Sequence, residues 1–200
     1  MYLPRGISNE NQFELLNKNE CREKLNLPPK KKIILQVGRA VHYRGFDWII
    51  NLMDACKDRE DLYFVMAGIN KWDPYYDKLE SRNCLLIEHV PHKDLVHYYN
   101  AADLLLFLIS GEKVLKFGGV GYVPIEALSC GLPVVATSFH HIKKFGIDDI
   151  GRIPNSQEDL LPMIEELLKN SPPRERCRKK ALQLFSWNEI IPKFWEYYKS

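Results

Sequence analysis

The stretch GGVGYVPIEALSCGLPVVAT, residues 118–137, contains a glycine-rich loop, a short helical segment and an apolar strand in that order. Three of its first four residues are glycine, which permits positive φ angles and a close approach of the backbone to a ligand. Pro124 suits the first turn of a helix and Gly131 suits its end, while VVAT at 134–137 is typical of a buried strand. This succession is the repeating unit of an α/β fold.

The rest of the chain repeats the same alternation. Short continuous apolar runs, typical of strands buried on both faces, lie at 32–38, 62–68, 84–90, 103–109 and 132–137, with a weaker one at 150–153. Helices are predicted at 46–56, 72–81, 93–102, 123–130, 173–185 and 187–198, and one from Ser156, which Asp159 follows at capping-box spacing. The alternation predicts an α/β fold with a doubly wound parallel sheet, in which ligands bind beyond the carboxyl ends of the strands.

Composition narrows the class of protein. The chain has 200 residues, 46% of them hydrophobic and 27% charged, and a formal net charge of +2. This length fits one domain or one half of a larger enzyme, and the weak interspersed charge argues against a general nucleic-acid binder. The five scattered cysteines have no zinc-site spacing and suit reduced thiols. With no apolar signal core at the start and no run long enough to span a bilayer, a cytoplasmic location is expected.

The loop GRAVHYRG, residues 38–45, follows the first predicted strand. Gly38 allows a sharp turn, and Arg39 and Arg44 then lie beside the positive end of the next predicted helix. Cations at that end do not stabilise the helix, so the two arginines indicate an anion, best a diphosphate held by guanidinium forks. The alternative is that both are solvated surface arginines.

The glycine-rich segment 118–126 predicts a second part of a ligand site. Free N–H groups at the start of the following helix favour anions, and Glu126, expected near the first turn, could accept hydrogen bonds from the two hydroxyls of a ribose. The alternative is that Glu126 only complements the helix dipole. A nicotinamide-binding fingerprint is disfavoured, because Pro124 takes the sixth position of GxGxxG and the loop follows the fourth strand.

The histidines do not indicate a metal site. His89, His92 and His97 surround the third strand, and His140 and His141 follow the fifth, without the spacing or the carboxylate partner of a metal centre. No GxSxG or other nucleophile arrangement is present. We therefore expect neither a metal nor a protein nucleophile.

Several motifs together resemble one family. VGRAVHYRG resembles the V-G-R-x-x-x-x-K-G loop of retaining, nucleotide-sugar-dependent glycosyltransferases of the group 1 type. GYVPIEALSCGLPVVAT resembles their signature E-G-F-G-x-x-x-x-E-A-x-A-x-G-x-P-V-V-A-T. NAADLLLFLIS and the closing FSWNEIIPKFWEYY resemble the family's A-A-D strand and C-terminal helix. The motifs occur in the family's order and spacing over nearly the whole chain.

The resemblance implies the GT-B architecture, two facing Rossmann-like domains of which this chain is the C-terminal, donor-binding one. Residues 1–30 would be the linker with a helix that leads into the domain, 31–185 the nucleotide-sugar-binding domain, and 186–200 a helix that packs on the N-terminal, acceptor-binding domain. That domain would belong to the same or a separate chain, and through it the full enzyme could contact a membrane. Alone, the domain is expected to be inactive.

The resemblance also implies roles for single residues. Arg39 and Arg44 would bind the donor diphosphate and stabilise charge on the leaving nucleotide, Glu126 would bind the ribose, and Val90 would contact the base through its backbone. The implied donor-binding residues are Gly38, Arg39, Arg44, Val90, Gly118, Gly119, Val120, Gly121, Tyr122 and Glu126. The donor would be a nucleotide diphosphate sugar, with no metal and no other cofactor.

Two departures from the family pattern bear on activity. The first acid of the family's acid pair falls on Gly118, and Glu112 is an open alternative source of that carboxylate. Arg44 replaces the usual lysine but keeps the cation. The implied activity is transfer of a hexose to a saccharide or lipid acceptor with retention. The missing acid keeps a non-catalytic nucleotide-sugar-binding or assembly subunit as the alternative, while AADLLLFLIS and FSW argue against an epimerase.

Overall fold

The fold is built on one parallel sheet. The computed structural model describes residues 6–7, 11–110, 121–139 and 146–199. Within them, six strands pair in the order β3-β2-β1-β4-β5-β6. The strands are β1 (Lys32–Val37), β2 (Leu62–Ala67), β3 (Cys84–Ile87), β4 (Leu104–Phe107), β5 (Val134–Ala136) and β6 (Gly151–Arg152). Every pairing is parallel, and this order confirms the predicted doubly wound sheet.

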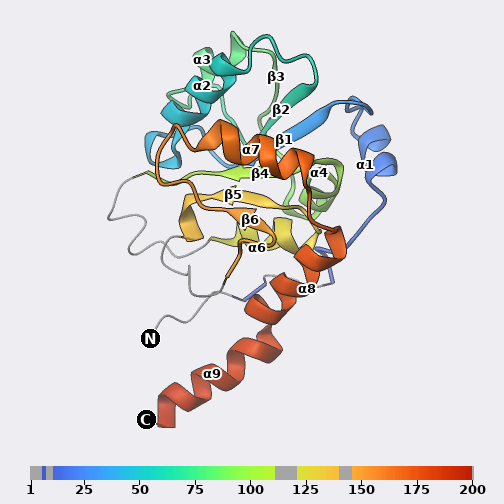
Figure 1. The fold of residues 1–200 in the computed structure, drawn as a ribbon, viewed down its shortest axis with the longest axis vertical. Coiled ribbons are helices and arrows are strands. Elements are labelled where there is room, and N and C mark those ends of the chain that lie inside the picture. Colours follow the sequence, from blue (N-terminus) through green and yellow to red (C-terminus); the bar gives the residue numbers. More distant parts are fainter. Residues whose placement is uncertain (1–5, 8–10, 111–120, 140–145, 200) are drawn as a thin grey trace.

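Helices cover both faces of the sheet. One apolar cluster joins it to α2 (Phe46–Ala55), α3 (Tyr76–Glu80) and α7 (Leu160–Lys169). The other joins it to α1 (Lys18–Lys24), α4 (Leu95–Ala101), α6 (Tyr122–Ser129) and α8 (Arg174–Phe185). Figure 1 shows α7 lying across the sheet. Strands enclosed in this way read as continuous apolar runs, which is why the sequence revealed them.

The chain changes direction across the sheet between β1 and β4. These neighbours pair at Ile34↔Leu104 and Leu35↔Leu105. The helix that follows β1 is α2, on one face, whereas α6 follows β4 on the other face. Such a switch point leaves a crevice beyond the carboxyl ends of the two strands, where doubly wound sheets bind ligands.

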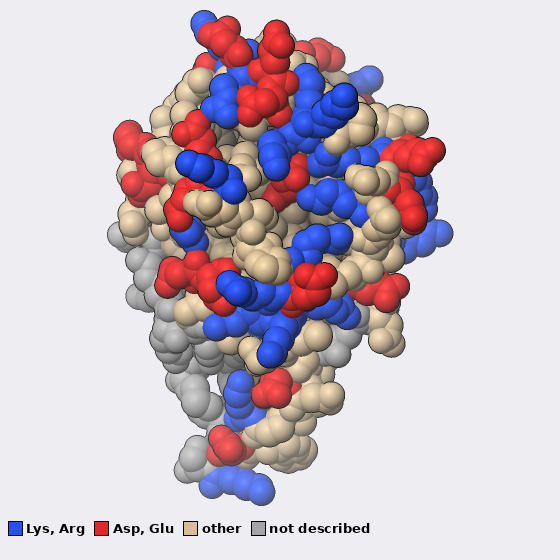
Figure 2. Space-filling view, turned by 45° about the vertical axis from the view of Figure 1, so that its right-hand side comes forward, with Lys and Arg blue, Asp and Glu red and all other residues tan. Residues whose placement is uncertain are grey.

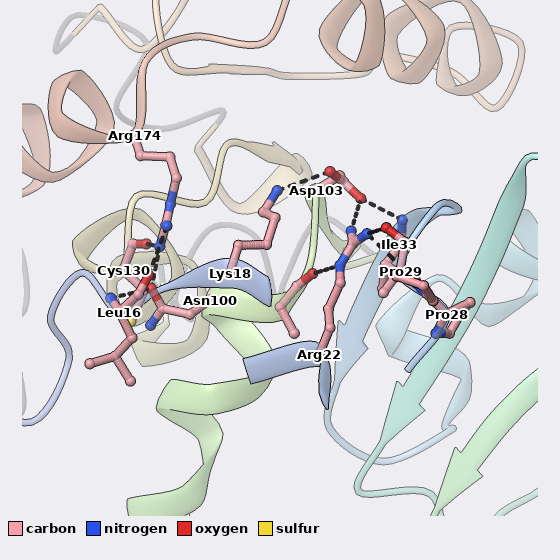
Figure 3. Close-up of polar contacts among 11 residues, drawn as sticks. Leu16, Lys18, Arg22, Pro28, Pro29, Ile33, Asn100, Asp103, Cys130 and Arg174 are labelled. Atoms are coloured by element: carbon pink, nitrogen blue, oxygen red, sulfur yellow. Dashed lines mark hydrogen bonds and ion pairs between the residues drawn. The ribbon is translucent and has the colours of Figure 1, made fainter. Parts of the chain in front are cut away.

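A polar network fixes α1 at the opposite, amino-terminal edge of the sheet. The Asp103 carboxylate, just before β4, accepts hydrogen bonds from Lys18 Nζ at 2.9 Å, Arg22 Nη2 at 2.6 Å and Ile33 N at 2.7 Å. Figure 3 shows these side chains meeting at Asp103, and Arg174 reaching Asn100 and Cys130 nearby. Burial would raise the pKa of Asp103, but Lys18, the Ile33 N–H and Arg22 together hold it below its ordinary value. The network is a structural clamp far from the crevice.

Helix α9 (Trp187–Lys199) differs from the other helices because it projects from the body of the domain, as Figure 1 shows. Its side chains Ile191, Phe194, Trp195 and Tyr198 are exposed, at 46%, 38%, 63% and 81%. They line an apolar hollow of about 360 Å³. No described helix is both long and apolar enough to cross a lipid bilayer.

Helices α3 and α7 each begin about a full turn later than predicted. Helix α3 begins at Tyr76 rather than at 72, because the chain first turns around Asp73, which accepts the Asn70 N–H through its carboxylate. Helix α7 begins at Leu160 rather than at Ser156. The Asp159 carboxylate does reach back to the Ser156 N–H at 3.0 Å, but the Ser156 hydroxyl bonds Glu158 and residues 157–159 form a turn.

Candidate functional site

The loops after β1 and β4 are tied together at the switch point. Ser110 donates from its backbone N–H to the Tyr43 carbonyl at 2.9 Å and from its hydroxyl to the His42 carbonyl at 2.9 Å. Gly45 has a φ of 66°, and a Cβ there would lie 2.6 Å from Leu108 Cβ. Only glycine fits this approach, so the last residue of the GRAVHYRG loop sets the distance between the two loops.

Arg44 lies in this crevice. Its guanidinium carbon is 5.0 Å from the centroid of the Phe107 ring, at the end of β4, and 5.6 Å from that of Tyr43. A Cβ on Gly38 would lie 4.0 Å from the same carbon. The Nε atom of Arg44 is buried and has no hydrogen-bond partner among the described residues. A buried donor without an acceptor is costly, and a ligand oxygen would satisfy it.

The start of α6 meets the same aromatic ring. Gly121 caps this helix with a φ of 81°, and a Cβ on it would lie 3.5 Å from Phe107 Cζ. Phe107 therefore brings together the arginine loop after β1 and the amino-terminal end of α6. A guanidinium and a helix N-terminus both favour negative charge, so this point of the molecule suits an anion.

Arg39 has a different environment. Its side chain is 59% exposed, and its Nε and Nη2 both lie 3.0 Å from Oδ1 of Asp73, which is buried. The other oxygen of Asp73 accepts the N–H groups of Ala40 at 3.0 Å and Asn70 at 3.1 Å. Burial would raise the pKa of Asp73, but these N–H groups and Arg39 hold it below its ordinary value. Asp73 thus joins the loops after β1 and β2.

Glu126 lies deeper than the sequence suggested. It is the fifth residue of α6, in the second turn rather than the first, because the helix begins at Tyr122. It is 1% exposed. Its Oε1 lies 2.9 Å from Nε2 of His92, and its Oε2 accepts the hydroxyl proton of Tyr99 at 3.0 Å. Burial and the nearby Glu126 raise the pKa of Tyr99 well above its ordinary value, so the phenol stays a donor.

Val90 is half-buried and lines a groove of about 260 Å³. The groove is also lined by Lys24, His89, Pro91, His97 and other residues. Within it, Lys24 Nζ lies 2.7 Å from His97 Nε2. Burial and the Lys24 charge lower the pKa of His97, so the neutral ring accepts this contact. The groove borders the loop between β3 and α4.

The structure therefore brings Gly38, Arg44 and Gly121 together around Phe107, and it places Arg39 with Asp73 and Glu126 with His92. Tyr122 is 44% exposed at the start of α6. Gly118, Gly119, Val120 and the alternative acid Glu112 lie outside the described residues, as do His140 and His141.

Sequence reasoning missed four residues of the site: Asp73, His92, Tyr99 and Phe107. Asp73 lies in the loop after the second strand, and ligands bind beyond the carboxyl ends of the strands in such sheets. An acid in that loop was therefore a usable signal. His92 lies in the turn before α4 and Tyr99 lies within α4, so no helical spacing pointed to this pair. Phe107 gave no signal, because an aromatic residue in an apolar strand is ordinary.

A second hollow lies at the opposite edge of the sheet. It measures about 230 Å³, and Arg59 and Arg82 are among its lining residues. Arg59 bonds Asp61 at 2.8 Å and Glu165 at 2.6 Å, and Arg82 bonds Asp54 at 2.7 Å. Both cations already have carboxylate partners, in contrast to the Nε of Arg44. Figure 2 shows the same mixing of acidic and basic side chains over the visible face.

Within the described part of the chain, no three His, Cys, Asp or Glu side chains come together as a metal site. The expectation that the chemistry needs no metal stays a prediction.

The sequence matches a family model described as "Glycosyl transferases group 1" over residues 17–184. Over 191 residues the chain is 26% identical to the lipopolysaccharide glucosyltransferase WaaG of Escherichia coli, a match that covers 90% of this chain and 49% of that protein. The chain spans about half the length of the curated relatives that it matches.

Two solved structures are similar in fold. The C-terminal domain of LpcC, a group 1 family glycosyl transferase of Francisella tularensis, superposes with a TM-score of 0.63 at 17% identity, covering 93% of this chain and 97% of that one. Anabaena HepE, in complex with UDP-glucose, superposes with a TM-score of 0.74 at 14% identity, covering 96% of this chain and 56% of that one. At such identities the likeness concerns the fold.

Proposed function

Since the chain belongs to the group 1 glycosyltransferase family, we propose that it is the donor-binding domain of a retaining enzyme, which moves a hexose from a nucleotide diphosphate sugar to a saccharide or lipid acceptor. The domain has the Rossmann-like fold of GT-B glycosyltransferases. The bound UDP-glucose of the structurally similar HepE supports a nucleotide-sugar donor.

The observation that carries the proposal is the buried Nε of Arg44, without a partner among the described residues, beside Gly38 and the Phe107 ring. A diphosphate at this point would accept hydrogen bonds from the guanidinium, with the start of α6 close by. As the bond between sugar and phosphate breaks, negative charge grows on the leaving diphosphate. A cation already in place stabilises that charge without reorganisation.

Arg39 would add a second cation. Asp73 holds one edge of its guanidinium, and the side chain is 59% exposed at the rim of the site. The Ala40 N–H bond to the same carboxylate fixes the loop that carries Arg39. We therefore propose that Arg39 meets the diphosphate from the solvent side, whereas Arg44 meets it from within.

The proposed reaction needs a second domain. The chain spans about half of its curated relatives, and the exposed apolar face of α9 is the kind of surface that a partner domain covers. We propose that acceptor binding belongs to that partner and that this domain alone binds the donor without transferring sugar.

Calorimetric titration with UDP, GDP and ADP tests donor binding. We expect one of them to bind, and Arg44→Ala to weaken its binding about 10- to 100-fold, because the variant loses charge-assisted hydrogen bonds. Arg82→Ala is the matched control, since it removes a cation at the opposite edge and should leave the affinity unchanged. Equal affinities in wild type and Arg44→Ala would contradict the proposal.

A second candidate function is a non-catalytic nucleotide-sugar-binding or assembly subunit. The glycine at position 118, where the family pattern has an acid, favours it. Measuring transfer and donor binding on the complete protein separates the two candidates. Tight donor binding without any transfer would support the subunit, and transfer would exclude it.

A further inference from the structure

The carboxylate of Glu126 contacts two side chains of very different exposure, Tyr99 and His92. Tyr99, on α4, is fully buried and bonds Oε2. His92, in the short turn His92–Asp94 before α4, bonds Oε1, and its side chain is 56% exposed. Tyr99 has no room to leave without opening the core, whereas the His92 ring can rotate into solvent.

The position of His92 is itself braced. The buried Phe13 ring packs edge-on against His92 at 5.2 Å and against Tyr99 at 5.8 Å between centroids. Gln12 Nε2 donates to the His92 carbonyl at 3.0 Å. These contacts favour the arrangement in which the imidazole covers Oε1.

The covered carboxylate conflicts with direct ligand binding. Glu126 is 1% exposed, so a ribose hydroxyl cannot reach Oε1 while the imidazole lies over it. Rotation of His92 would remove the imidazole from Oε1 and leave Oε2 on Tyr99, which keeps the carboxylate oriented. Val90 lies two residues before His92 in the same loop, so a base bound at Val90 would act on the segment that carries the ring.

We propose that His92 is a gate on Glu126: the imidazole and a ribose hydroxyl compete for Oε1, and a nucleotide binds fully only after the ring has moved. This inference rests on the proposed function, in which Glu126 holds the donor ribose. Tyr99 is the fixed positioning residue in both states. Only protein molecules in which the His92 ring has moved away bind the ribose fully. The apparent Kd is therefore the intrinsic Kd divided by the fraction of molecules in that state.

The test compares two probes on wild type and His92→Ala. The probes are the nucleoside diphosphate that binds best among UDP, GDP and ADP, and its 2′,3′-dideoxy form, which has no ribose hydroxyl to offer Glu126. If the gate is closed about four-fifths of the time, His92→Ala tightens the ribonucleotide about fivefold. The dideoxy form should bind both proteins equally.

Lys93→Ala is the matched control, because it changes an exposed side chain of the same turn. It should leave both affinities unchanged, and circular dichroism checks that each variant folds. Weaker ribonucleotide binding in His92→Ala would overturn the gate and make His92 a support of Glu126. Equal changes for both probes would indicate damage to the loop and also overturn it. No nucleotide bound by either wild type or His92→Ala would instead refute the proposed function.

Discussion

Asp73 shows how one buried carboxylate sets the geometry of a binding loop. Its Oδ1 accepts a hydrogen bond from the Arg39 guanidinium, and its Oδ2 accepts the N–H groups of Ala40 and Asn70. The loop after β1 is therefore held by a residue 34 positions later in the chain. Arg44, in the same loop, has no such acid among the described residues, and this contrast separates the roles proposed for the two arginines.

We expect Asp73→Asn to lower the free energy of unfolding by about 1–3 kcal/mol at neutral pH, because a buried charged acceptor with several donors is lost. The folded pKa of Asp73 lies below the ordinary value of 3.8. Its contribution is therefore fully present above that pH and is lost as the pH falls through the folded pKa. The difference between variant and wild type should narrow below about pH 4.

Urea unfolding across this pH range measures the effect. The control is Asp77→Asn, which removes the same charge from an exposed position four residues on. The prediction would be contradicted if the difference in free energy of unfolding between Asp73→Asn and wild type stayed constant with pH. An equal loss in Asp77→Asn would also contradict it.

For single residues, the sequence predicted which residue types belong to the proposed site better than it predicted what surrounds their side chains. GRAVHYRG indicated two anion-binding arginines, and both lie at the ligand edge of the sheet. Their opposite surroundings depend on Asp73, in the loop after β2, and on Phe107, in β4. No local sequence pattern encodes such distant pairings. Likewise Glu126 was identified as a site acid, but its burial beneath His92 arises from the packing of α4 against α6.

Helix α6 has a well-defined carboxyl-terminal end. The Gly131 N–H bonds the Leu128 carbonyl at 2.9 Å, and the Leu132 N–H bonds the Ala127 carbonyl at 2.9 Å. This pattern is a Schellman motif, which requires a left-handed residue, and Gly131 has a φ of 76°. The predicted helix end at Gly131 is thus confirmed, and it fixes where β5 starts.

We predict that Gly131→Ala costs more stability than the positive φ angle alone explains, because the added Cβ would also overlap with neighbouring atoms. A Cβ there would lie 2.6 Å from Leu15 Cδ2 and 2.7 Å from Arg174 Cβ. Gly146 has a φ of 57° with no described atom within 4 Å of its added Cβ, so Gly146→Ala has only the conformational cost, about 1 kcal/mol. In denaturant unfolding, Gly131→Ala should lower the free energy of unfolding by at least twice as much as Gly146→Ala does. Equal losses would contradict the close packing.

Strands β1, β2, β4 and β5 were predictable because nearly all their residues are buried, so that their apolar runs are continuous. The starts of α3 and α7 were not, because the carboxylates of Asp73 and Asp159 bond turns ahead of each helix. Such local competition between side chain and helix is invisible to hydrophobic periodicity.

The whole molecule is a parallel sheet between two helical layers, with a buried core on each face. Helix α9 carries an exposed apolar face away from this body. Acidic and basic side chains are mixed over the face that Figure 2 shows. We therefore expect the proposed nucleotide binding to depend on the local geometry at the switch point rather than on a large patch of one charge.

We propose that a nucleoside diphosphate binds at the carboxyl edge of the sheet, between β1 and β4. The most direct measurement is a titration of the isotope-labelled chain with UDP, GDP and ADP, following backbone amide shifts by nuclear magnetic resonance. We predict that the largest shifts for the nucleotide that binds fall at residues 38–45, 88–92 and 121–126. Shifts concentrated instead at 54–62 and 81–83, around the hollow at the opposite edge, would contradict the account.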